Sequence, residues 1–146
     1  MKKIARSAIL PHSAEALYAI VEDIESYPRF LPWCRGTKVA RTEAGTRAEL
    51  QIGMRGLQQS FTTQNENHPG RAIDMRLVDG PFRSFAAAWR FQPLRADACR
   101  VEFSMECEFA SRALAGLLEP VFETIANTMV DAFSRRADAL HGQHPG

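Results

Sequence analysis

Cysteine is scarce in this sequence, and the few that occur argue against two kinds of stabilising site. Cys34, Cys99 and Cys107 lack the closely spaced pairs that hold structural zinc. Their odd number also argues against a closed disulfide framework. We therefore expect no metal site and no such framework, and a reducing cytoplasm is the natural compartment for the chain.

A strong net charge and a long apolar run are also missing. The formal net charge is +1 over 146 residues, which gives no long-range attraction to nucleic acid or to an anionic membrane. Residues 1–4 resemble the start of a signal peptide, but Arg6 and Pro11 break the apolar stretch that follows. No window approaches the roughly 18 apolar residues that span a bilayer. The length predicts one domain, residues 1–146, with a frayed tail at 141–146.

Motifs for enzymatic chemistry are absent as well. Neither a phosphate-binding loop nor a dinucleotide fingerprint occurs, and Cys34 has no histidine nearby in the sequence to activate it. General acid–base catalysis inside a fold needs a titratable group there. The charged residues of the predicted strands instead share the face opposite the apolar one: Glu49, Asp74, Arg76, Glu102, Glu106 and Glu108. We expect no catalytic residue and no enzymatic activity. The sequence does not show which distant segments meet, so a catalytic arrangement formed between them stays open.

The chain begins with the pattern of a strand and a short amphipathic helix. Residues 4–10 are predicted to form a strand that Pro11 ends, and Ser13 stands where a helix N-cap would. Apolar residues then recur at helical spacing, at Leu17, Ile20, Val21 and Ile24. This helix is expected to bury one face.

Alternation with a period of two dominates residues 37–109 and predicts antiparallel strands. Turn signals at Gly56, 68–70 and 79–81 separate the runs. The clearest run has one apolar face, made of Cys99, Val101, Phe103, Met105, Cys107 and Phe109. We predict about six strands here, and about seven together with the first strand.

After residue 111 the period returns to 3.6 and predicts a long helix. Its apolar stripe consists of Leu114, Leu117, Leu118, Val121, Phe122, Ile125, Met129, Phe133 and Leu140. Pro120 cannot donate a hydrogen bond to Gly116, so the helix should kink or restart there. We favour a short helix ending at Leu118 and a new one with Pro120 in its first turn. The alternative is a mobile lid at residues 114–118.

This order of elements predicts an α+β fold, with helices on one face of a curved antiparallel sheet. A bent sheet around a single helix leaves space between the two, and concave apolar spaces bind small ligands. The alanines of residues 85–89, Phe-Ala-Ala-Ala-Trp, support such a space because a filled core would use larger side chains. Close approach of the helix or of a neighbouring subunit explains them equally well.

Two segments carry a resemblance to a known family. Residues 27–34, Tyr-Pro-Arg-Phe-Leu-Pro-Trp-Cys, and residues 77–82, Leu-Val-Asp-Gly-Pro-Phe, resemble the coenzyme Q-binding, START-like family of helix-grip proteins. The resemblance runs to about residue 139. It implies a helix-grip fold that binds ubiquinone or a similar prenylated lipid, in support of respiration or quinone synthesis, with no required cofactor.

The resemblance also implies two alternatives. The bacterial branch of the family includes a ribosome-association toxin, which binds the large ribosomal subunit and blocks subunit joining. Related helix-grip proteins act as polyketide cyclases or aromatases. A lipid carrier would also make transient contact with the inner face of a membrane, and the oligomeric state stays open.

A lipid cavity needs aromatic and flexible apolar side chains on the inward faces, and methionine suits an adaptable wall. The same side chains can also fill an ordinary core. The candidate ligand-binding residues are Tyr27, Phe30, Leu31, Trp33, Met54, Phe61, Met75, Leu77, Phe85, Trp89, Phe103, Met105, Leu118, Phe122, Ile125 and Met129. Tyr27, Trp33 and Arg83 could donate hydrogen bonds to a quinone ring, with rim or structural positions as the alternative.

Ribosome binding would need an exposed patch of positive side chains that holds phosphate. The candidates on neighbouring predicted strands are Arg35, Lys38, Arg41, Arg47 and Arg55. A solvated strand face is the simpler explanation for them. The two functions are compatible, because a lipid cavity and an RNA-binding surface would use different sides of the sheet.

Overall fold

The computed structural model describes residues 2–141, and its elements follow the predicted order. In chain order they are β1 (Lys2–Leu10), α1 (Ala14–Glu22), the 3₁₀ helix η1 (Ile24–Arg29), β2 (Cys34–Thr42), β3 (Gly45–Met54), β4 (Leu57–His68), β5 (Ala72–Asp79), β6 (Phe82–Arg95), β7 (Ala98–Phe109) and α2 (Arg112–His141). His141 thus belongs to α2, not to a frayed tail, and residues 142–146 of the predicted tail lie outside the described residues.

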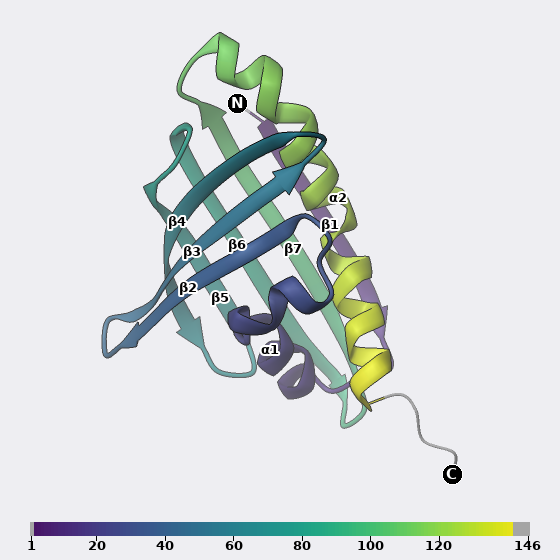
Figure 1. The fold of residues 1–146 in the computed structure, drawn as a ribbon. Helices are drawn as coiled ribbons and strands as arrows, with labels where there is room; N and C mark the ends of the chain where they lie inside the picture. Colours follow the sequence, from purple (N-terminus) through teal and green to yellow (C-terminus); the bar gives the residue numbers. More distant parts are fainter. Residues whose placement is uncertain (1, 142–146) are drawn as a thin grey trace.

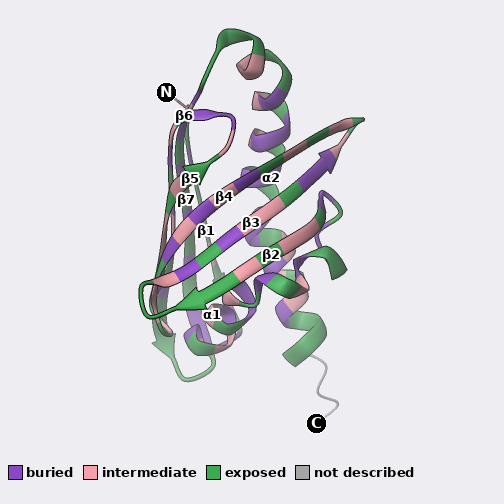
Figure 2. Cartoon of the chain, turned by 60° about the vertical axis from the view of Figure 1, so that its left-hand side comes forward, coloured by how far each residue is buried: buried purple, intermediate pink, exposed green. Residues whose placement is uncertain are grey.

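One antiparallel sheet contains the seven strands, in the order β1-β7-β6-β5-β4-β3-β2. In Figures 1 and 2 the strands β2–β4 lie across α2, whereas β1 and β5–β7 form a differently inclined part of the sheet. Buried residues alternate with half-buried or exposed ones along most of β3 and β4, as the period of two requires (Figure 2). The predicted α+β, helix-grip architecture is therefore confirmed.

The shortest ladder in the sheet joins β5 to β6. Their ladder runs only from Ala72 to Arg76 on β5. Beyond it, β5 stays with β4 while the start of β6 stays with β7. Phenylalanine rings fill the gap, and Gly80 lets the connecting turn pass close to them, because a Cβ at this position would lie 2.8 Å from the Cβ of Phe61.

The predicted N-terminal helix forms as α1. The Ser13 hydroxyl accepts a hydrogen bond from the Ala16 amide at 3.1 Å, and Leu17, Ile20 and Val21 are buried. The chain then continues as η1, which contains Pro28. A 3₁₀ turn tolerates proline here because the fixed φ of about −65° suits it.

The prediction of two C-terminal helices is wrong, because α2 runs unbroken through Pro120. Proline removes one backbone hydrogen bond, and packing of the neighbouring Val121 and Phe122 against the sheet outweighs that loss. The ribbon of α2 changes direction in its first turns (Figure 1), consistent with the predicted kink. Leu117 and Leu140 are exposed although both were predicted in the apolar stripe. Among the described residues 2–141, no helix is both long and apolar enough to cross a membrane.

Candidate functional site

A cavity lies between the inner face of the sheet, α1, η1 and α2. Its volume is about 60 Å³, room for roughly four waters. Its walls are mainly apolar. Most of the predicted ligand-binding residues line it, namely Tyr27, Trp33, Phe61, Met75, Phe85, Trp89, Phe103, Met105, Phe122, Ile125 and Met129.

The other predicted ligand-binding residues lie beside the cavity and not in its wall. Phe30 packs edge-on against Phe133, with ring centroids 5.3 Å apart, and Arg136 covers its ring at 4.9 Å. Leu31 is buried in the core. The remaining three are core or half-buried packing residues: Met54, Leu77 and Leu118. The motif of residues 27–34 therefore sends Tyr27 and Trp33 to the cavity and uses its other apolar side chains as anchors.

Two of the three predicted hydrogen-bond donors to a quinone ring are engaged by the protein itself. The Tyr27 hydroxyl donates to the Val21 carbonyl, and burial raises the pKa of Tyr27. Arg83 is exposed and pairs with Glu108 at 2.9 Å. Both side chains thus take the structural or surface positions that the sequence left as the alternative, while Trp33 does line the cavity.

The three alanines of residues 86–88 do not widen the cavity. Ala87 is buried, but it is absent from the cavity wall, and Ala86 and Ala88 belong to the opposite, outer face of β6. Phe85 and Trp89 on either side are the residues of this segment that line the cavity. The sequence interpretation treated three consecutive residues as one surface, whereas a strand turns alternate residues to opposite faces.

One end of the wall is a cluster of packed phenylalanines, in which Phe61, Phe85 and Phe122 line the cavity and Phe82 packs behind them. The ring of Phe122 lies 5.5 Å from that of Phe61 and 5.0 Å from that of Phe82, both edge-on. Phe61 also meets Phe85 at 5.6 Å. These distances and angles are the favourable ones for aromatic pairs. This aromatic end therefore joins β4, β6 and α2 at the place where β5 and β6 are no longer paired.

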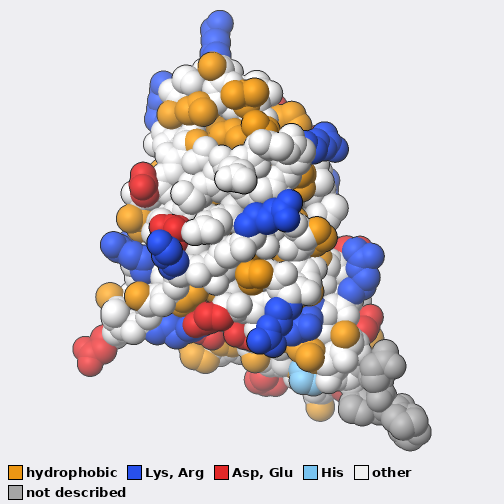
Figure 3. Space-filling model, in the orientation of Figure 1, with side chains coloured by type: hydrophobic (Ala, Val, Ile, Leu, Met, Phe, Trp, Pro, Cys, Tyr) orange, Lys and Arg blue, Asp and Glu red, His pale blue; other side chains and the backbone are white. Residues whose placement is uncertain are grey.

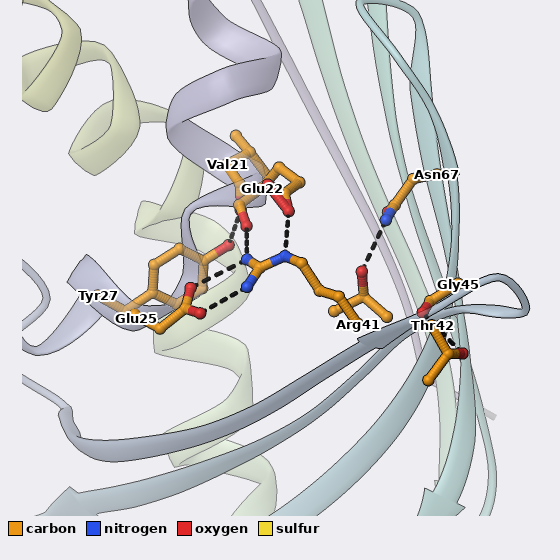
Figure 4. Close-up of polar contacts among 9 residues, drawn as sticks. Val21, Glu22, Glu25, Tyr27, Arg41, Thr42, Gly45 and Asn67 are labelled. Carbon is orange, nitrogen blue, oxygen red and sulfur yellow. Dashed lines mark hydrogen bonds and ion pairs between the residues drawn. The ribbon is translucent and has the colours of Figure 1, made fainter.

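The wall also contains a polar group that the sequence interpretation missed. Thr46, Thr63 and Asn65 are each more than nine-tenths buried, and Asn67 is half-buried. Thr63 donates a hydrogen bond to Asn65 Oδ1 at 2.8 Å. Asn67, labelled in Figure 4, donates from Nδ2 to the Thr46 hydroxyl at 2.7 Å. A signal existed, because Thr63, Asn65 and Asn67 continue the inward positions that Phe61 begins. The other lining residues missed are Val21, Glu22, Ile24, Ala48, Leu50, Ile52, Ile73 and Ala126.

Arg41 connects β2 to α1 and η1 beside the cavity (Figure 4). Its guanidinium binds Glu22 Oε1 and Glu25 Oε2, each at 2.5 Å. Hydrogen bonds with Glu25 and Glu22 raise the pKa of Arg41, and the bond from Arg41 lowers the pKa of Glu25. Because Arg41 stands opposite the buried Thr46 in the β2–β3 ladder, it belongs to the inner face of the sheet.

The five candidate phosphate contacts do not share one face. Arg41 is on the inner face and is paired with carboxylates, whereas Lys38 and Arg47 point outward. Arg55 occupies the turn between β3 and β4, and Arg35 lies at the bulge of β2 near Gly53. On the face seen in Figure 3, Lys and Arg are dispersed among acidic and neutral side chains.

Few titratable side chains around the cavity are free to exchange a proton with a ligand. Glu22 is bound to Arg41, and Tyr27 is the other titratable residue of the described wall. Cys34, Cys99 and Cys107 are buried free thiols, and burial raises the pKa of each. Within residues 2–141, no group of three or more His, Cys, Asp or Glu side chains is arranged to hold a metal ion.

Comparisons with known proteins agree with this geometry. The family model described as polyketide cyclase / dehydrase and lipid transport matches residues 10–134. Ribosome association toxin RatA of Pseudomonas aeruginosa is 42% identical over 140 residues, which cover 95% of this chain and 97% of the toxin. The mitochondrial coenzyme Q-binding protein COQ10 homolog B of Xenopus laevis is 31% identical over 144 residues, covering 95% of this chain and 59% of that protein.

A solved START superfamily protein from Mycobacterium smegmatis matches with a TM-score of 0.80, over 94% of this chain and 98% of that one. At 20% sequence identity this likeness shows the fold alone. The sequence relatives confirm the resemblance inferred from residues 27–34 and 77–82. With a family model that extends from the end of β1 into α2, the chain belongs to the polyketide cyclase/dehydrase and lipid transport family.

Proposed function

We propose that the protein binds a hydrophobic molecule, ubiquinone or a similar prenylated lipid, and carries it without chemical change. The observation that supports this most is the apolar cavity enclosed by sheet and α2. Its wall combines rigid aromatic rings with Met75, Met105 and Met129. Similarity to a coenzyme Q-binding protein supports the choice of ligand class.

Binding requires the cavity to widen. Ligand cavities usually measure about 300–1,000 Å³, and the space of about 60 Å³ found here is much smaller. The lining methionines are unbranched and can change rotamer, so they supply part of the adjustment. A shift of α2 away from β3 and β4 would supply the rest, with loss of the Phe61–Phe122 ring contact, because α2 packs chiefly on β7, β1 and α1.

An isoprenoid tail provides enough free energy for this binding. Burial of one five-carbon unit contributes about 3–4 kcal/mol at roughly 0.8 kcal/mol per methylene. Two or three such units exceed the association and ordering cost by enough for about micromolar affinity. No salt bridge to the ligand is then needed.

The environment of Glu22 and Tyr27 supports a carrier over a cyclase or aromatase. An enzyme of that type needs an acid or base that can exchange a proton with its substrate. Glu22 is held by Arg41, and the Tyr27 hydroxyl is committed to the Val21 carbonyl. Assay with a polyketide substrate would detect turnover if the cavity nevertheless supported catalysis.

Organic extraction of natively purified protein, followed by mass spectrometry, tests the carrier proposal. We expect a prenylated quinone in the extract of the wild type. Phe122→Asp should abolish its retention, because an unpaired carboxylate would enter the apolar wall. Leu140→Asp is the matched control, since Leu140 is exposed on the same helix. Full retention by folded Phe122→Asp, judged by circular dichroism, would contradict the proposal.

Delivery of such a lipid implies transient contact with a membrane. Hydrophobic side chains gather at the end of the molecule where α2 begins (Figure 3), and Leu117 in this part of α2 is 56% exposed. Co-sedimentation with lipid vesicles should weaken in Leu117→Ser. Unchanged sedimentation of this variant would show that the exposed Leu117 on α2 does not take part in membrane contact.

Association with the large ribosomal subunit is the second candidate, favoured by the 42% identity to RatA over nearly its whole length. The outward Lys38 and Arg47 are the candidate phosphate contacts that remain on one face of neighbouring strands. Salt-sensitive sedimentation with large ribosomal subunits, together with an extract free of lipid, would favour this function. Lys38→Glu/Arg47→Glu should then abolish sedimentation, whereas Arg100→Glu on β7 should not.

A further inference from the structure

The polar group in the cavity wall is placed so that two hydrogen-bond donors lie side by side. Thr46 and Asn65 are directly opposite each other in the β3–β4 ladder. Opposite residues project from the same face of the sheet, with Cβ atoms about 5 Å apart. Both line the cavity, and they are 2% and 3% exposed.

The Asn65 side chain has a donor that the protein does not use. Within residues 2–141, its one side-chain hydrogen bond is the one that Oδ1 accepts from Thr63, so Nδ2 has no protein partner. No fully enclosed side-chain nitrogen or oxygen in this part of the chain lacks a partner. Nδ2 must therefore border accessible space, and the cavity is the space that Asn65 lines. A buried polar group of this kind costs free energy unless something bonds to it.

Thr46 adds a second donor. Its hydroxyl oxygen accepts from Asn67, and within residues 2–141 its proton has no protein acceptor. The wall holds no Lys, Arg or His, and its charged member is Glu22, which is bound to Arg41. Such a wall suits uncharged acceptor oxygens and disfavours a carboxylate.

We propose that Asn65 and Thr46 form a head-group subsite that donates hydrogen bonds to carbonyl or ether oxygens of an uncharged ligand head. The inference rests on the proposed lipid binding and narrows its ligand class to a lipid with an uncharged, oxygen-bearing head. The tail then extends along the apolar wall towards Phe61 and Phe122. Hydrocarbons and fatty acids are the weaker ligands.

Three probes with the same ten-carbon tail test this subsite: decyl-1,4-benzoquinone, decylbenzene and 4-decylbenzoate. Displacement of the dye Nile red gives the affinity of each for the full-length protein. The wild type should bind the quinone roughly tenfold more tightly than decylbenzene, as expected for two neutral hydrogen bonds. The benzoate should bind most weakly of the three.

The double variant Thr63→Val/Asn65→Leu removes the Asn65 donor without leaving the Thr63 hydroxyl unpaired, which favours folding. It should bind decylbenzene at least as well as the wild type and lose most of the preference for the quinone. Gln64→Leu makes the same amide-to-leucine change on the opposite face of β4 and should keep that preference.

Three outcomes would overturn the subsite. They are equal wild-type affinities for quinone and decylbenzene, tightest binding of the benzoate, or an unchanged quinone preference in the double variant. In each of them hydrophobic binding itself stands. If none of the probes binds the wild type, the proposed lipid binding fails, and the subsite fails with it.

Discussion

The two ends of the cavity wall are built from opposite kinds of side chain. At the aromatic end, Phe61, Phe82 and Phe122 meet edge-on with ring centroids 5.0–6.1 Å apart. At the polar end, Thr46 and Asn65 are as deeply buried but carry hydrogen-bonding groups that the protein uses only in part. The aromatic rings pack against one another, whereas the polar side chains keep hydrogen-bond donors without a protein partner.

This contrast separates stability from recognition. Aromatic burial and ring contacts stabilise the fold whether or not the cavity is occupied. Buried threonine and asparagine contribute little net stability, because their hydrogen bonds replace bonds to water. Substitutions at the aromatic end should therefore lower the free energy of unfolding most, and substitutions at the polar end should change ligand preference more than stability.

The largest expected effect is that of Phe122→Ala. Removal of a buried phenylalanine ring costs about 3–5 kcal/mol of unfolding free energy, because contacts are lost and a cavity remains. Urea denaturation followed by circular dichroism measures this loss. Leu117→Ala, an exposed position on the same helix, should change stability by less than about 0.5 kcal/mol. Similar losses in both variants would show that the aromatic end is not a packed centre.

Thr46→Val should have a smaller effect. It removes the acceptor of the Asn67 amide, and leaving a partly buried donor unpaired costs about 1 kcal/mol. The same urea experiment applies, with Thr62→Val on the outer face of β4 as the control. A loss as large as that of Phe122→Ala would erase the contrast between the two ends.

Arg41→Gln should have the smallest effect, and one that depends on pH. The ion pairs are partly exposed, so their loss costs at most about 1 kcal/mol at neutral pH. Arg41 lowers the pKa of Glu25 in the folded protein from its ordinary value of 4.5. The stabilisation is therefore present above pH 4.5 and is lost as the pH falls through the lower folded value.

Urea denaturation of wild type and Arg41→Gln at pH 7 and at pH 3 measures this dependence, and the difference between them should narrow at pH 3. Lys38→Gln removes the same charge from the other face of β2. A gap between wild type and Arg41→Gln that widens in acid would contradict the assigned role of Glu25.

Local patterns predicted most of the architecture because burial imposes them residue by residue. The run from Cys99 to Phe109 has to alternate if one face is dry, and Ser13 has to cap α1 if the Ala16 amide is to be satisfied. The aromatic residues of the cavity wall were predictable for the same reason, because they occupy the apolar positions of these patterns. Pro120 misled because the sequence shows the lost hydrogen bond but not the packing of Val121 and Phe122 that keeps α2 continuous.

The polar end could not be assembled from the sequence because it depends on register. Thr46 becomes the neighbour of Asn65 only through the ladder between β3 and β4. Likewise, Arg41 reaches the inner face because a bulge between Cys34 and Gly36 shifts the alternation of β2. The sequence interpretation grouped Arg41 with the other basic residues as a phosphate contact. The register of β2 instead places Arg41 beside Glu22 and Glu25.

The brief ladder between β5 and β6 has a mechanical consequence. It joins two leaves of sheet along residues Ala72 to Arg76 only, and each leaf keeps its own strand pairs beyond that seam. A change in the angle between the leaves would keep the strand pairs within each leaf, but it would shift the contacts of Phe61 with Phe82 and Phe85 that bridge them. Breathing of this kind would let one scaffold take in tails of different lengths.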